Sequence, residues 1–126
     1  MTARQLIHAD EDKLIRVFLN IAKNAKEAMK NSGDFLFKIS DEENFVLFEM
    51  TDNGPGIPEE IRDHLFDSFV TSGKENGTGL GLAIVRKIVD EHKGEISLNT
   101  IVGRGTTFYI KMPTFDAMQK ANHAEN

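Results

Sequence analysis

The stretch FVLFEMTDNGPGIPEE, residues 45–60, combines an apolar alternating segment, a glycine-rich loop and the start of a helix. The alternation predicts a strand and places Asp52 on the same face as Met50 and Phe48. If that face is the core, a carboxylate lies in apolar surroundings and needs hydrogen-bond donors, which a ligand can supply. A surface aspartate in a hairpin turn is the plain alternative. The helix that begins at Pro58, where a returning strand would otherwise follow, weakens that alternative.

The same patterns outline the rest of the chain. Helical periodicity predicts a long helix that Asp10 caps and Gly33 ends, and another from Leu80 to about His92. Alternation predicts strands at residues 5–8, 35–40, 45–52, 95–100 and 106–112. Hairpins beside helices indicate an α+β fold, a two-layer α/β sandwich, in which a mixed, mainly antiparallel sheet of about five strands packs against three helices. We expect one domain over residues 1–113 and a polar C-terminal tail over 114–126.

The composition excludes several classes of protein. The chain has 126 residues, no cysteine and a net charge of -5. Without cysteine, it has neither disulfides nor thiolate metal sites. The negative charge argues against nonspecific nucleic-acid binding, and no apolar run approaches the length of a membrane span. An anionic ligand is still compatible with this charge if backbone amides and a few cations act locally.

Two asparagines lie one turn apart on the long predicted helix. Asn20 and Asn24 share one side of it with Glu27, at the margin of the apolar arc. Asparagine is a poor residue for a helix interior, because its side chain competes for backbone hydrogen bonds. Considered alone, the pair is more often solvated or locally bonded than functional. The functional alternative is an amide oxygen that binds a hard cation, such as a Mg²⁺ shared with phosphate oxygens.

A glycine-rich segment opens the later helix. In GTGLGL, residues 77–82, backbone amides and the positive end of the helix dipole can reach a phosphate chain. Lys74 and Ser72 in the preceding loop add a charge and a hydroxyl. The order is not that of a P-loop, because Glu75 follows Gly73-Lys74. A flexible loop with a solvated lysine is the plain alternative.

A second glycine-rich turn precedes the last predicted strand. GRGTTF, residues 103–108, is by default the turn of a hairpin. The strand that follows directs Thr106 to the same face as Phe108 and Ile110. Its hydroxyl can then join Asp52 around the polar edge of a ligand.

Taken in order, these segments resemble the catalytic ATP-binding domain of sensor histidine kinases, which has the Bergerat fold of a superfamily that includes type II topoisomerases and heat-shock chaperone ATPases. The resemblance runs from about Gln5 to Met112. The short lid is similar to that of the nitrogen-regulation-type kinases. The segments that carry it are NIAKNAKEAM (20–29), DNGPGI (52–57), LFDSFVTS (65–72), GTGLGLAIV (77–85) and GRGTTF (103–108).

The resemblance implies ATP and Mg²⁺ as ligands and a role for individual residues. Asn24 corresponds to the Mg²⁺ ligand, and Asn20 lies beside the phosphates. Asp52 corresponds to the carboxylate that accepts the exocyclic amine of adenine. Around the base, the implied contacts are Gly54, Gly56, Ile57 and Thr106. Over the phosphates and at the base of the lid they are Phe66, Phe69, Thr71, Ser72, Lys74, Gly77, Thr78, Gly79, Leu80, Gly81 and Leu82.

One position bears on the reaction. Superfamily members that hydrolyse ATP, and the related serine kinases, usually carry a glutamate four residues before the magnesium asparagine, where it orients or deprotonates the nucleophile. Here that residue is Asn20, which cannot act as a base. We therefore expect a protein-histidine kinase, because a neutral histidine is already nucleophilic. An anti-sigma-type serine kinase and a nucleotide-binding interaction module without chemistry are the alternatives.

The phosphoacceptor is expected on another domain. None of the four histidines of the chain lies in the His-Glu or His-Asp context of a phosphoacceptor hairpin. The expected partners are a dimerisation domain with the acceptor histidine, in the full-length protein or in trans, and a response regulator downstream. We expect a cytoplasmic domain that contacts neither nucleic acid nor membrane. A membrane anchor elsewhere in the full-length protein stays open, as does the cation that replaces a lysine common in the family at Glu27.

Overall fold

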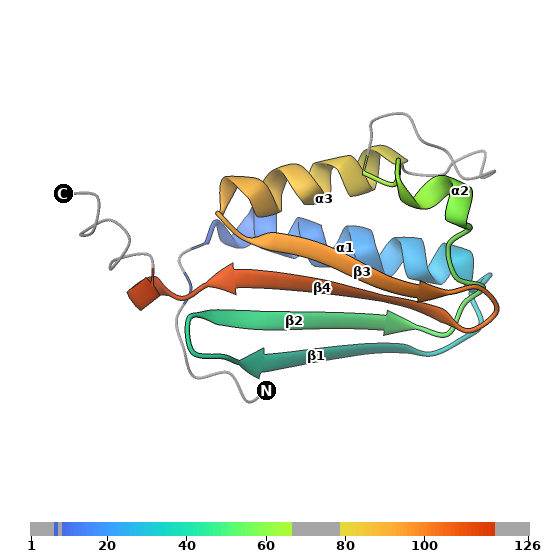
Figure 1. Cartoon of the computed structure of the whole chain (residues 1–126), viewed down its shortest axis with the longest axis horizontal. Coiled ribbons are helices and arrows are strands. Elements are labelled where there is room, and N and C mark those ends of the chain that lie inside the picture. The colour runs from blue at the N-terminus through green and yellow to red at the C-terminus, as the bar shows by residue number, and fades with distance from the viewer. Residues whose placement is uncertain (1–6, 8, 67–78, 118–126) are drawn as a thin grey trace.

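The computed structural model describes residues 7, 9–66 and 79–117. It shows two layers, an antiparallel sheet and helices that cover one of its faces (Figure 1). Within the described residues the sheet has four strands in the order β1-β2-β4-β3, and each neighbouring pair is antiparallel. The elements are α1 Glu11–Ala28, β1 Phe35–Asp41, β2 Phe45–Asp52, α2 Glu59–Arg62, α3 Gly79–Glu91, β3 Glu95–Ile101 and β4 Gly105–Pro113.

The predicted two-layer α+β sandwich is confirmed, with both hairpins and all three helices. The sheet differs from the prediction in one respect. Of the expected first strand, residues 5–8, only Ile7 is described, and it forms an isolated antiparallel bridge with Thr114. The described sheet is therefore antiparallel throughout and not mixed. Thr114 is also buried and donates its N–H to the carbonyl oxygen of Asn44, so contacts with the sheet extend past Pro113.

Helix α1 begins where the sequence predicts and ends earlier. Asp10 is the N-cap, and its Oδ1 accepts a hydrogen bond from the N–H of Lys13 at 3.1 Å. The helix ends at Ala28, although Gly33 was predicted to end it. Lys30 and Asn31 adopt left-handed backbone angles, with φ of 56° and 65°, and helices commonly end in this conformation. The prediction was wrong here because it expected a glycine in that role.

Removal of the α1 cap gives a first stability prediction. Asp10→Ala should lower the free energy of unfolding by about 1 kcal/mol, because the N–H of Lys13 loses its acceptor. Asp10→Asn is the matched control, since asparagine caps helices about as well as aspartate. Urea unfolding followed by circular dichroism measures both variants. Equal stability of the alanine and asparagine variants would show that the cap contributes nothing.

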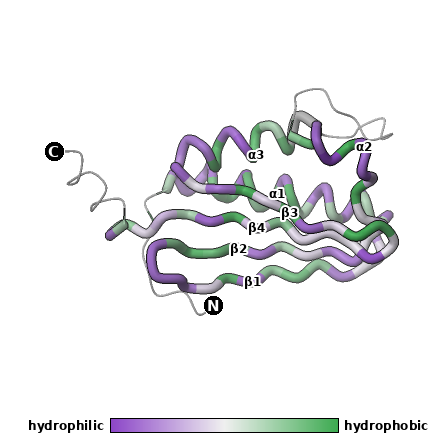
Figure 2. The backbone as a smooth tube through the Cα atoms, viewed as in Figure 1, coloured by the Kyte–Doolittle hydropathy of each residue, from purple (hydrophilic) through white to green (hydrophobic). Residues whose placement is uncertain are grey.

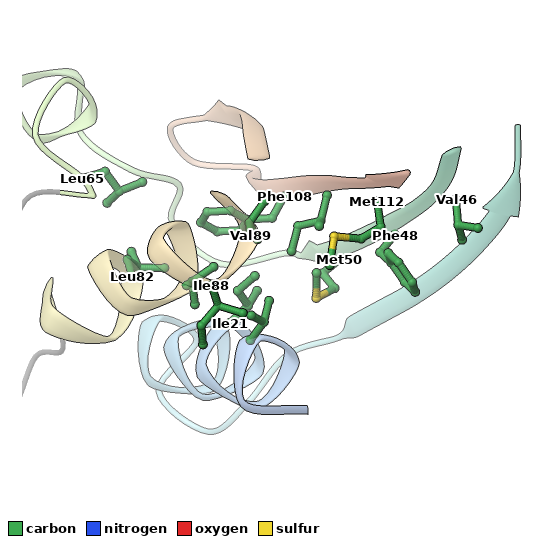
Figure 3. Close-up of a cluster of buried hydrophobic side chains, with 13 residues drawn as sticks. Ile21, Val46, Phe48, Met50, Leu65, Leu82, Ile88, Val89, Phe108 and Met112 are labelled. Carbon is green, nitrogen blue, oxygen red and sulfur yellow. The ribbon is translucent and has the colours of Figure 1, made fainter. Parts of the chain in front are cut away.

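The core lies between the sheet and the helices. Side chains from α1, α3, β2 and β4 point toward one another there (Figure 3). Burial alternates along β2: Val46, Phe48, Met50 and Asp52 are buried, and the residues between them are partly exposed. The loop between β1 and β2 is hydrophilic (Figure 2). Asp52 therefore lies on the core face, as the alternation predicts.

Within residues 7, 9–66 and 79–117, no helix is both long and apolar enough to cross a bilayer.

Candidate functional site

Strand pairing places three polar side chains in one row on the helix-covered face of the sheet. Asp52 on β2 pairs with Thr106 on β4, which in turn pairs with Thr100 on β3. They are 8%, 5% and 9% exposed, respectively. We call these three residues the polar row. It lies where β2 ends and the β3–β4 turn begins, at the right-hand end of the sheet in Figure 1.

The Asp52 carboxylate has few partners within the protein. Its Oδ1 accepts a hydrogen bond from the N–H of Gly54 at 2.9 Å, and among the described residues this is its only hydrogen-bond donor. An ionised carboxylate can accept about four hydrogen bonds. Because a buried charge is costly without donors, Asp52 is suited to bind a ligand that brings N–H or O–H groups.

The loop after β2 is hydrogen-bonded to the residue before β1 and lies close to the end of α1. The N–H of Asp34 donates to Oδ1 of Asn53 at 2.9 Å, and the N–H of Asn53 donates to the carbonyl oxygen of Asp34 at 3.3 Å. A Cβ atom on Gly54 would lie 3.0 Å from Oδ1 of Asp52 and 3.2 Å from Cγ of Met29. The loop therefore runs tightly between the Asp52 carboxylate and the end of α1, where a side chain has little room.

Contacts with the β3–β4 turn account for Gly56. Its φ is +80°, and a Cβ atom there would lie 2.6 Å from the carbonyl oxygen of Ile101. The N–H of Gly103 donates to the carbonyl oxygen of Pro55 at 2.8 Å. The resemblance attributes Gly54 and Gly56 to the approach of a base, and the structure adds a reason within the chain itself.

Thr100 connects the loop after β2 with the β3–β4 turn. It was not identified from the sequence as a site residue. Its Oγ1 accepts the N–H of Ile57 at 2.9 Å, lies 2.9 Å from Oγ1 of Thr106 and donates to the carbonyl oxygen of Gly105 at 3.2 Å. Alternation along β3 places Thr100 on the face of Ile96 and Leu98. That pattern was the available signal, because a threonine on an apolar face needs hydrogen-bond partners.

Asn20 and Asn24 are both partly buried on α1, and the Nδ2 atom of Asn24 is inaccessible to solvent. Among the described residues, no three histidine, aspartate or glutamate side chains cluster as a metal site would require. Mg²⁺ is usually held by one or two protein oxygens together with phosphates and waters, and it does not need such a cage. The amide oxygen of Asn24 fits this type of site.

The other predicted contacts divide into two groups. The structure does not describe Phe69, Thr71, Ser72, Lys74, Gly77 or Thr78. Their assignments stay predictions, as do the ligand contacts of the described residues. Helix α3 begins at Gly79, within one residue of the predicted start, and Leu82 packs into the hydrophobic core. Phe66 packs against the core as well, with the Arg86 guanidinium 5.6 Å from the centre of its ring.

The family model and the relatives that match this chain all concern histidine kinases or ATPases related to them. The family model described as histidine kinase-, DNA gyrase B- and HSP90-like ATPase matches residues 9–116. The protein named sensory histidine kinase/phosphatase NtrB in Rhodobacter capsulatus is 44% identical over an alignment of 117 positions, gaps included, that covers 82% of this chain. The protein of the same name in Azospirillum brasilense is 39% identical over an alignment of 128 positions, gaps included, that covers 90% of this chain. This chain spans 32% of the length of each.

A solved structure shares the fold. Full-length ShkA in complex with AMPPNP matches with a TM-score of 0.75 and 32% sequence identity. The match covers 87% of this chain and 23% of that one. The architecture of the described residues is therefore that of a part of a larger relative.

Proposed function

Because this chain belongs to the histidine kinase-, DNA gyrase B- and HSP90-like ATPase family, we propose that it binds ATP with Mg²⁺ as the catalytic domain of a sensor histidine kinase. It donates the γ-phosphoryl group of ATP to a histidine on a separate phosphoacceptor domain. ATP as the donor places this reaction in the cytoplasm, and a response regulator is the next acceptor. The observation that carries the proposal is the buried Asp52 carboxylate, to which a single described residue donates a hydrogen bond.

Adenine has the chemistry that Asp52 requires. Its exocyclic amine carries two N–H groups, and a carboxylate accepts such hydrogen bonds strongly because it is charged. Thr106 pairs with Asp52 across β2 and β4, so its hydroxyl lies beside the carboxylate. Ile57, held by Thr100 at 2.9 Å, supplies an apolar surface at the same end of the sheet. These residues support a purine base in this position.

The phosphates belong next to α1 and the start of α3. Asn24 would hold Mg²⁺ through its amide oxygen, with Asn20 one turn away toward the phosphates. When bound, the metal ion neutralises charge on the phosphate oxygens. The first backbone N–H groups of α3, from Gly79 onward, favour an anion because they form the positive end of the helix dipole. Lys74 and Ser72 would add a charge and a hydroxyl from the segment before α3.

The transfer needs no base from this chain. A neutral imidazole nitrogen of the acceptor attacks the γ-phosphorus while the bond to the β,γ-bridging oxygen breaks, and ADP leaves with the electron pair of that bond. Solvent then takes the ring proton of the phosphorylated imidazole. Asn20 stands where a glutamate would activate water or a serine hydroxyl, and it cannot remove a proton. This chemistry favours histidine as the acceptor.

The direct test mixes this chain with a dimerisation hairpin from an NtrB-like kinase, Mg²⁺ and γ-labelled ATP. We expect acid-labile label on the hairpin, and none on a hairpin whose acceptor histidine is replaced by glutamine. Label that survives acid on a serine would indicate the serine kinase instead. ATP binding without label on any hairpin tried would reduce the function to nucleotide-dependent interaction.

The metal assignment gives a further prediction. Asn24→Ala should raise the Mg²⁺ concentration for half-maximal transfer about tenfold, because one of very few protein ligands is removed. Asn99→Ala is the matched control, since Asn99 is exposed on β3. A magnesium titration of transfer to the hairpin measures both variants. The same requirement for Mg²⁺ in both would exclude Asn24 as the ligand.

A further inference from the structure

We propose that Thr100 sets the direction of the Thr106 hydroxyl and thereby makes the site select purines that carry an amino group at C6. The inference rests on the proposed function, because it concerns how the same site recognises its base. Thr100 itself acts as a positioning residue. It does not contact the ligand, and it acts on the site through its hydrogen bonds to Thr106 and Ile57.

A count of hydrogens assigns the direction. Oγ1 of Thr100 has three polar neighbours: the N–H of Ile57, the carbonyl oxygen of Gly105 and Oγ1 of Thr106, at 2.9, 3.2 and 2.9 Å. An amide N–H can only donate, and a carbonyl oxygen can only accept. Thr100 has one hydroxyl hydrogen, which the Gly105 carbonyl takes. Thr106 must therefore donate to Thr100, since only this assignment makes all three hydrogen bonds.

Because the Thr106 hydroxyl donates its hydrogen to Thr100, it can only accept a hydrogen bond from a ligand. Among the described residues, Thr100 is its only side-chain hydrogen-bond partner. The neighbouring Asp52 carboxylate also only accepts, so two acceptors lie side by side in the polar row. A 6-amino purine offers N–H groups to this pair. A 6-oxo purine presents a carbonyl oxygen to it, and an unpaired buried acceptor is costly.

The hydrogen bond to Ile57 could produce a different effect, which the experiment must separate. Loss of that bond would loosen the loop at residues 53–57. A looser loop would weaken the binding of every purine nucleotide to a similar extent, because the loop would contact the ring of the base and not the substituent at C6. A change in hydroxyl direction alters the ratio between 6-amino and 6-oxo purines. The ratio of affinities is therefore the decisive readout.

The experiment compares ATP with ITP, the corresponding 6-oxo purine nucleotide, by titration calorimetry. The unsubstituted chain should prefer ATP. Thr100→Val keeps the shape of the side chain but removes its hydroxyl, so the Thr106 hydrogen can turn toward the ligand. The ratio of the ITP Kd to the ATP Kd should then fall about three- to tenfold, the size of one hydrogen bond. Thr100→Ser restores the hydroxyl and should restore the ratio.

Each outcome decides a separate point. A chain that binds no ATP overturns the proposed function itself. An unchanged ratio of the two Kd values in a folded Thr100→Val variant, which includes an equal loss of affinity for both nucleotides, overturns the role of Thr100. If that variant does not fold, NMR of the unsubstituted chain decides. We expect the Thr106 hydroxyl proton to show a cross-peak to Thr100, and a Thr100 hydroxyl proton directed at Thr106 would overturn the assignment.

Discussion

Asp52→Asn is expected to weaken ATP binding by about 10- to 150-fold and to leave the chain folded. A hydrogen bond to a charged group contributes about 1.5–3 kcal/mol, and the substitution replaces the carboxylate by a neutral amide. The Oδ1 atom that accepts the N–H of Gly54 at 2.9 Å is retained, so the loop keeps its anchor. Titration calorimetry with ATP measures the affinity, and circular dichroism measures the fold.

The control removes a charge of the same sign elsewhere. Glu43→Gln changes an exposed side chain in the loop between β1 and β2, at the opposite end of β2 from Asp52. Its ATP affinity should be unchanged. If Asp52→Asn binds ATP as tightly as this control, the nucleotide base does not lie at Asp52 and the site assignment is wrong.

Gly105→Ala is expected to lower the free energy of unfolding by about 2–5 kcal/mol. Two costs combine: φ is +139°, which side chains rarely adopt, and the added Cβ would overlap the carbonyl oxygen of Asp52. Relief of this overlap would move the end of β2, so ATP affinity should fall as well. Urea unfolding measures the stability, and calorimetry measures the affinity.

Gly103→Ala is the matched control for the strain at this turn. Its φ is +86°, and a Cβ atom there would meet nothing within 4 Å. Only the backbone cost of about 1–2 kcal/mol should appear. If both variants lose the same stability, the close approach of Gly105 to Asp52 contributes nothing, and the two strand ends are less tightly joined than the structure shows.

Several features of the site were accessible from local patterns. The alternation in FVLFEMTD predicts that Asp52 faces the core with Met50, and the structure has both buried. The same argument places Thr106 beside Phe108. The start of α1 follows from Asp10, since a capping side chain acts within three residues of itself. These predictions succeed because they depend only on local geometry. Side chains along a strand alternate between its two faces, and a helix cap acts on residues of the first turn.

Local sequence patterns did not predict the end of α1. Lys30 and Asn31 take the left-handed conformation that was expected of a glycine, and Gly33 lies beyond them. A Cβ atom on Gly33 would overlap Sδ of Met29 and lie 2.7 Å from Oδ1 of Asn53, so a loop distant in the sequence constrains this position together with the end of α1. Local propensity is weak enough for such contacts to override it.

By itself, the sequence determined the order of the described helices and strands, the face that β2 and β4 bury, and the burial of Asp52 and Thr106. Tertiary structure alone decided that Thr100 completes their row and that Gly56 abuts Ile101. The reason is physical: alternation has a period but carries no register, and register depends on how strands far apart in the chain pair. Asp52 was a carboxylate that needed donors; the pairing of β2, β4 and β3 supplied its neighbours.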